Sequence, residues 1–166
     1  MGYTTAFDGK ITFDHPISSE LKNYINKFSD TRRMKRSNAQ IKKEFPNWKQ
    51  LCYNGKLGTE GEYFVGGLGF AGQGDDNSIL DYNDPPRTQP GLWCQWKINE
   101  TGDLIWNEAE KFYYYVEWLE YLINNFLEPN DYIANGVINF QGEDSDDYGY
   151  IEVINNKVHK VMGETK

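Results

Sequence analysis

The residues best suited to binding chemistry are three arginines in the segment Thr31-Arg32-Arg33-Met34-Lys35-Arg36. A guanidinium group presents several N–H donors in a flat fork that matches the oxygens of phosphates and carboxylates. Aromatic residues make up 16% of the chain, and their faces are suited to stacking on a nucleotide base. This combination favours the binding of a small nucleotide-like anion.

A second set of polar groups follows in a stretch that contains several prolines. The strings DYNDPP at 81–86 and QPGLWCQW at 89–96 supply amide and hydroxyl groups there. Proline fixes its own φ angle, so such a stretch is stiff. Together with the arginines, these groups predict a polar and aromatic pocket. The predicted ligand-binding residues are Arg32, Arg33, Arg36, Gln73, Asp81, Tyr82, Asn83, Gln89, Trp93 and Gln95.

The same arginines have a plainer interpretation. Aspartates are frequent between residues 66 and 91, and pairs of opposite charge are common on protein surfaces. Arg32 and Arg33 would then pair with these aspartates and fix the loop without binding any ligand. We favour this second interpretation slightly, and the sequence leaves both open.

The segment Gly67-Leu68-Gly69-Phe70-Ala71-Gly72 matches the GxGxxG pattern of dinucleotide-binding loops. In those loops the pyrophosphate sits at the N-terminus of the helix that follows. Here Asp75 and Asp76 follow instead, and their charges would repel a pyrophosphate. No βαβ pattern continues after them, so we do not expect a dinucleotide-binding fold.

We find no motif for a catalytic nucleophile and no pair of Cys or His residues at zinc-binding spacing. Two groups of aspartates depart from the calcium-loop spacing, and solvated turn residues are their default interpretation. The two groups are Asp75, Asp76, Asp81 and Asp84, and Asp144, Asp146 and Asp147. We therefore predict no catalytic residue, no metal and no cofactor, and we lean toward a non-enzymatic protein. A metal-assisted nucleotide hydrolase or transferase stays an alternative, because carboxylates that act as acids or bases need no motif.

The net charge of −8 is unevenly distributed. Residues 20–49 carry nine Lys and Arg against three acids, a net charge of +6, whereas the rest carries eight bases and 22 acids, a net charge of −14. This pattern indicates a basic patch on an acidic body, which would repel a long nucleic acid. The longest apolar run is too short to span a membrane, and the N-terminus lacks a signal-peptide pattern. We expect a cytoplasmic protein with no membrane partner.

The element that must organise the core is a long aromatic helix at about 110–127. One wide apolar stripe on it contains Phe112, Tyr115, Val116, Leu119, Leu122, Ile123 and Phe126. A second stripe, Tyr114, Trp118 and Tyr121, also needs a cover, which is the 66–91 loop, a partner or a ligand. Core packing within the chain is the favoured cover.

The remaining pattern predicts an α+β fold in a single domain over 1–166. Shorter helices are expected near 19–29 and 38–45, and strands at 92–98, 136–141, 149–154 and 157–162, the last two joined by an Asn155-Asn156 hairpin. The helices would lie on one face of an antiparallel or mixed sheet. The segment 66–91 is predicted to be a long ordered loop, with Phe70, Ile79, Leu80 and Tyr82 packed inside.

The strings TRRMKR, GEYF, DYNDPP, QPGLWCQW and EKFYYYVEWLEYLI resemble an uncharacterised family of small proteins from phages and bacterial genomes. This resemblance implies a mobile-element protein in the cytoplasm of a bacterial host cell, and it assigns no residue a role. Our leading hypothesis is a non-enzymatic accessory protein that sequesters a small nucleotide-like ligand or inhibits a host defence protein. A structural module that forms a homodimer is a further alternative.

Overall fold

The computed structural model describes residues 2–166, which divide into two compact units. Residues 2–23 and 95–166 form one unit, here called the sheet unit, and residues 24–94 form the other, the loop unit. The strands are β1 (Ala6–Phe13), β2 (Lys35–Arg36), β3 (Ile79–Asp81), β4 (Trp96–Ile98), β5 (Leu104–Trp106), β6 (Ala134–Gln141), β7 (Tyr148–Ile154) and β8 (Lys157–Met162). The α-helices are α1 (Ser19–Ser29), α2 (Asn38–Glu44) and α3 (Tyr115–Leu122). The predicted α+β class is confirmed, and a single domain over 1–166 stays a prediction.

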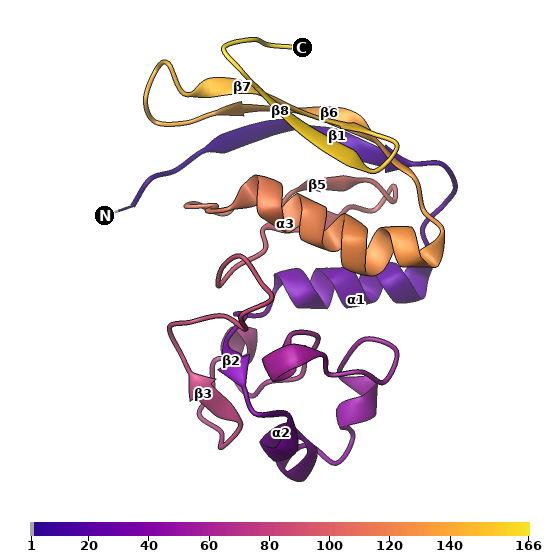
Figure 1. Ribbon diagram of the computed structural model, residues 1–166, viewed down its shortest axis with the longest axis vertical. Coiled ribbons are helices and arrows are strands. Elements are labelled where there is room, and N and C mark those ends of the chain that lie inside the picture. Colours follow the sequence, from indigo (N-terminus) through magenta and orange to yellow (C-terminus); the bar gives the residue numbers. More distant parts are fainter. Residues whose placement is uncertain (1) are drawn as a thin grey trace. The chain divides into compact units, whose positions relative to one another are not determined.

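Six strands of the sheet unit form one antiparallel sheet in the order β4-β5-β1-β6-β7-β8 (Figure 1). β1 pairs with β6 along its whole length, from Ala6 opposite Gln141 to Phe13 opposite Ala134. Asn155 and Asn156 connect β7 to β8 with φ angles of 46° and 70°. Tight hairpins need such positive angles, and asparagine tolerates them better than most residues. The predicted hairpin is therefore present.

Aromatic rings fill the core of the sheet unit. The Phe7 ring on β1 makes edge contacts with Trp96, Phe112 and Tyr115, at centroid distances of 5.2, 5.8 and 4.9 Å. Figure 1 shows α3 running along the face of the sheet that β1 and β6 help to form. Rings in edge contact add stabilisation to the area that they bury, which explains how a chain of modest apolar content builds this core.

The long aromatic helix begins later than its periodicity indicates. Lys111 and Tyr114 have left-handed φ angles of 60° and 59°, so regular α-helix starts at Tyr115 instead of about 110. After Leu122 the chain continues as a π-helical turn, Ile123–Leu127, and then as a 3-10 turn, Glu128–Asn130. Left-handed conformations for bulky residues are strained, and hydrophobic periodicity does not reveal them.

The second aromatic stripe is divided by this late start. Trp118 and Tyr121 are buried within 5.4 Å of each other, measured between ring centroids, in an edge contact. Tyr114, which precedes the helix, is 57% exposed. The stripe is therefore core at two of its three positions, as the favoured interpretation expected.

The loop unit has little regular structure and a small core. Ser37 caps α2 by accepting a hydrogen bond from the backbone N–H of Gln40 at 3.3 Å. The buried cluster next to it contains Ile41, Phe45, Cys52, Leu57 and Phe64. Short 3-10 turns lie at Trp48–Gln50, Thr59–Gly61 and Phe70–Gly72. No helix within residues 2–166 has the length and apolar character needed to span a membrane.

Candidate binding surface in the loop unit

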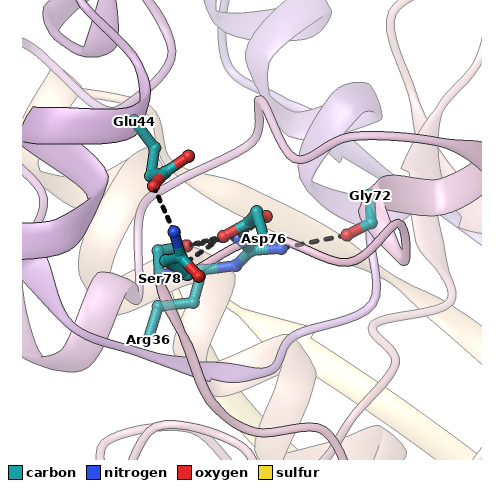
Figure 2. Close-up of polar contacts among 6 residues, drawn as sticks. Arg36, Glu44, Gly72, Asp76 and Ser78 are labelled. Carbon is teal, nitrogen blue, oxygen red and sulfur yellow. Dashed lines mark hydrogen bonds and ion pairs between the residues drawn. The ribbon is translucent and has the colours of Figure 1, made fainter.

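Arg36 is the centre of a buried polar cluster that holds the 66–78 segment (Figure 2). It lies on β2, which pairs with β3, and its side chain is 3% exposed. One terminal nitrogen, Nη1, donates to Asp76 Oδ2 at 2.9 Å and to Ser78 Oγ at 2.7 Å. The other, Nη2, donates to the carbonyl oxygen of Gly72 at 2.9 Å. Both arms of this guanidinium group are thus occupied by the chain itself.

Asp76 neutralises the buried charge of Arg36. Its side chain is 1% exposed, and its Oδ1 accepts the Ser78 backbone N–H at 2.8 Å and also the Ser78 hydroxyl. Burial by itself raises the pKa of this carboxyl, but the hydrogen bonds from Ser78 and Arg36 outweigh burial and leave the pKa below its ordinary value of 3.8. The neighbouring Asn77 amide donates to Glu44 Oε1 at 2.8 Å, which ties the segment to α2 (Figure 2).

Arg33 is also buried, and it binds backbone carbonyls. Its Nη2 donates to the carbonyl oxygens of Glu62 and Phe64 at 2.7 and 2.9 Å. The guanidinium carbon lies 4.2 Å from the centroid of the Phe28 ring, in a cation–π contact. Gln89 Nε2 donates to the same Glu62 carbonyl at 2.7 Å. Arg33 and Gln89 therefore act together on one turn of the backbone.

Arg32 is half-buried and lies against Tyr82. Its Nε donates to the Tyr82 carbonyl at 3.0 Å, and its guanidinium carbon lies 4.3 Å from the centroid of the Tyr82 ring. A terminal nitrogen donates to Asn83 Oδ1 at 3.4 Å, and the Tyr82 hydroxyl donates to Gln73 Oε1 at 2.7 Å. Asp81 accepts the Asn83 backbone N–H at 2.9 Å.

The ten residues predicted to bind a ligand thus fall into separate groups. One group is Arg32 with its neighbours Gln73, Asp81, Tyr82 and Asn83. Arg33 and Gln89 form a second group, and Arg36 belongs to the buried cluster with Asp76. Trp93 is half-buried, and Gln95 belongs to the sheet unit, where its Nε2 donates to the Glu110 carbonyl at 3.0 Å. The plainer interpretation expects Arg32 and Arg33 to pair with the loop aspartates. In the structure it is Arg36 that forms such an ion pair, with Asp76.

The residues around the GxGxxG pattern form a closed loop, here called the glycine loop (residues 66–78). The Gly74 N–H donates to the Leu68 carbonyl at 2.6 Å and closes the neck. A Cβ atom added at Gly67 would lie 2.7 Å from both Arg36 Nη2 and the Gly72 carbonyl oxygen. The glycines therefore let the two sides of the neck and the Arg36 side chain meet, which accounts for the pattern without a pyrophosphate.

The tip of the glycine loop is held by further backbone contacts. The Gln73 N–H donates to the Phe70 carbonyl, and the Arg32 N–H donates to the Ala71 carbonyl, both at 3.0 Å. Ala71 has a left-handed φ of 54°, which is uncommon for a residue with a side chain. These bonds fix a backbone conformation that an unsupported chain would seldom adopt.

Four large apolar side chains of the loop unit are exposed, and all lie between residues 68 and 82. They are Leu68 at 50%, Phe70 at 90%, Leu80 at 62% and Tyr82 at 43%. The prediction that these residues pack inside the loop is therefore wrong for Phe70, Leu80 and Tyr82, whereas the fourth residue, Ile79, is half-buried. Hydrogen bonds and Arg36 order the loop in place of apolar packing. The exposed apolar residues of the sheet unit are instead distributed over several elements.

Comparisons with known proteins give no function. No family model, no curated protein and no solved structure matches this chain. Within residues 2–166, no three His, Cys, Asp or Glu side chains gather closely enough to hold a metal ion.

Proposed function

We propose that this chain is a non-enzymatic accessory protein of a phage or mobile element that docks onto a host protein, in the first instance a defence protein. The docking surface is the tip of the glycine loop together with Leu80 and Tyr82. The observation that carries this proposal is Phe70, an aromatic residue 90% exposed on a loop fixed by hydrogen bonds. The four exposed apolar side chains of the loop unit all lie between residues 68 and 82, and contiguous apolar surface on a protein marks interaction sites.

The fixed backbone favours binding because the loop loses little conformational entropy when a partner binds. Association normally loses free energy when loops and side chains become immobile at the interface. Arg36 already holds the carbonyl of Gly72, and Arg32 holds that of Ala71. A partner therefore meets a loop that is already in its binding conformation.

The arginine contacts favour protein docking over the sequestration of a nucleotide-like anion. Arg33 and Arg36 are buried and donate to acceptors of this chain. A phosphate would have to displace those carbonyl and carboxylate oxygens, which leaves buried groups without partners and is unfavourable. Arg32 is the more accessible of the three, and Tyr82 already covers one side of it.

Site-specific photo-crosslinking in bacterial cells tests the docking proposal. A benzophenone-bearing phenylalanine replaces Phe70 and keeps an aromatic ring at the tip of the loop. We expect one discrete crosslinked adduct with a host protein. The same probe at Tyr113, an exposed aromatic of the sheet unit, is the matched control and should give no such adduct. Equal adducts at both positions, or none at position 70, would contradict the proposal.

Calorimetric titration with nucleotides and cyclic nucleotides tests the ligand alternative. We expect no heat of binding beyond dilution. Saturable binding that Arg32→Ala removes, while the unfolding midpoint stays unchanged, would favour a nucleotide-like ligand over a protein partner. Turnover of the nucleotide in the presence of Mg²⁺ would favour the hydrolase alternative.

A further inference from the structure

The sheet unit has a groove whose walls are aromatic and charged, and the proposed docking surface does not include it. The groove has a volume of about 600 Å³, within the range of small-molecule sites, and it lies beside α3 and the edge strand β8. Its lining consists of Tyr114, Tyr115, Val116, Glu117, Glu120 and Lys160. We infer that this groove binds an organic cation, whose ammonium or guanidinium group contacts the tyrosine rings and the two carboxylates.

The two carboxylates of the groove are available to such a cation. Within residues 2–166, the side chains of Glu117 and Glu120 make no hydrogen bond and no ion pair, and both are exposed. They lie three residues apart on α3, and residues at this spacing are neighbours on one face of a helix. A cation that carries N–H donors can therefore bind both carboxylates without displacing any partner of theirs.

The tyrosine rings supply the second kind of contact. The Lys160 ammonium lies 4.8 Å from the centroid of the Tyr115 ring and 5.0 Å from that of the Phe140 ring. The wall of the groove therefore already contacts one ammonium group, which belongs to the chain itself. The Tyr114 ring is 57% exposed and makes no ring contact within the described residues. Its face is open to a further cation, because ammonium and guanidinium groups are attracted to the faces of aromatic rings.

The backbone before α3 holds Tyr114 at the groove. Glu108, Lys111 and Tyr114 have left-handed φ angles of 67°, 60° and 59°. Such conformations are strained for residues with side chains, and strained residues are frequent at ligand-binding sites. The Trp118 N–H donates to the Tyr114 carbonyl at 2.8 Å, which joins Tyr114 to the first turn of the helix. Tyr114 is therefore positioned before any ligand binds.

The charges of the sheet unit decide the class of ligand. This unit contains 17 acidic and seven basic residues, a net charge of −10, which attracts cations and repels anions. An apolar ligand would remove water from two carboxylates and an ammonium group without pairing them, which is unfavourable. A metal ion needs more ligands, since within residues 2–166 no three His, Cys, Asp or Glu side chains gather to hold one. The remaining class is an organic cation, either a free polyamine or a Lys or Arg side chain of a protein.

NMR titration of the full chain tests the groove with two probes, spermidine and a glycine peptide that contains two arginines. We expect saturable shifts of the amides of residues 114–120 and of Lys160. Replacement of both carboxylates, Glu117→Gln with Glu120→Gln, should weaken binding by at least about tenfold. Tyr114→Leu should weaken it by about threefold through loss of the ring. Lys160→Gln should strengthen it by about threefold, because the variant removes a like charge.

The matched control is Glu100→Gln with Glu128→Gln, which removes the same charge from two exposed positions outside the groove. This control should change the affinity by less than about twofold. Thermal unfolding midpoints equal to that of the parent establish that each variant is folded. Saturation by spermidine supports a free polyamine as the ligand, and saturation by the peptide alone supports a protein side chain.

Three results would overturn the inference. The first is the absence of saturable shifts at the groove with both probes. The second is equal weakening by the groove variant and its control, which would mean that only the overall charge of the unit attracts the probes. The third is weaker binding by Lys160→Gln, which would mean that the ligand is not a cation. The crosslink at position 70 reports the docking function independently, because these variants leave the glycine loop unchanged.

Discussion

The sheet unit and the loop unit order their backbones by different means. In the sheet unit, strand ladders pair the backbone groups, and aromatic rings around Phe7 fill the core. In the loop unit, side chains replace much of the ladder: Arg33 and Gln89 bind the Glu62 carbonyl, and Arg36 binds that of Gly72. The first arrangement tolerates exchanges among apolar residues, whereas the second depends on particular hydrogen-bonding groups.

The two units also differ in net charge. The sheet unit contains 17 acidic and seven basic residues, a net charge of −10, and the loop unit contains eight acidic and ten basic residues, a net charge of +2. Two of the basic residues in the loop unit, Arg33 and Arg36, are buried and serve the fold. A basic segment in a sequence can therefore mark the scaffold of a loop as readily as a site for an anion.

The largest expected effect comes from the aromatic core of the sheet unit. Phe7→Ala removes a ring that touches Trp96, Phe112 and Tyr115, and it should lower the free energy of unfolding by about 3–5 kcal/mol. Denaturant unfolding measures this loss. The same substitution at exposed Phe70 is the control and should stay within about 0.5 kcal/mol of the parent. Equal losses at both positions would show that the core is not where the structure puts it.

The next effect should appear in the loop unit. Asp76→Asn leaves the buried Arg36 guanidinium without its anion, and we expect a loss of about 3 kcal/mol. Hydrogen exchange should show faster exchange of the amides of the glycine loop, with the β1–β6 ladder still protected. Asp75→Asn changes an exposed neighbour and should alter neither. If the amides of both units lost protection from exchange equally, the substitution would act on the whole chain and not on the loop unit alone.

A smaller effect should follow from crowding the neck of the glycine loop. Gly67→Ala places a methyl group 2.7 Å from both Arg36 Nη2 and the Gly72 carbonyl, and the cost should be about 2 kcal/mol. Gly55→Ala, whose added carbon meets open space at a φ of 72°, should cost about 1 kcal/mol through its backbone alone. Thermal unfolding of the two variants compares them directly. A neck variant no less stable than the Gly55 variant would refute the close packing.

The smallest expected effect is the dependence on pH of the stability that the Asp76 carboxyl contributes. The pKa of Asp76 is lower in the folded chain than its ordinary value of 3.8, so this carboxyl adds stability that is fully present above that value. The contribution should disappear as the pH falls through the lowered pKa, below about pH 4. Exchange rates of the glycine-loop amides at several pH values, corrected for the intrinsic rate, measure it. The Asp76→Asn variant should lack this pH dependence.

The sequence predicts part of the sheet unit and less of the loop unit. Alternation of apolar residues and the Asn155-Asn156 pair predict the C-terminal hairpin, because each residue there follows its local preference. The start of α3 is not predictable in this way, since Tyr114 adopts a strained left-handed φ of 59°. The spacing of apolar residues gives no information about backbone strain at a single residue.

The candidate surface could be located in part. The density of glycine and aspartate between 66 and 91 indicates a functional loop, and Tyr82, Gln73 and Arg32 do lie together there. The exposure of Phe70 does not follow from its residue type, because an aromatic residue usually packs inside. Its neighbours Gly69 and Gly72, whose positive φ angles let the chain turn, are the sequence signal for a protruding residue.

The closed neck of the glycine loop separates the residues that set its shape from those that are exposed on its surface. Arg36, Asp76 and Gly67 act at the base, whereas the side chains of Leu68 and Phe70 face solvent. Substitutions at these exposed positions can therefore change the surface of the loop while the fold stays the same. Under the proposed docking function, these few positions would set the binding specificity of the chain, whereas its stability would depend on the residues at the base.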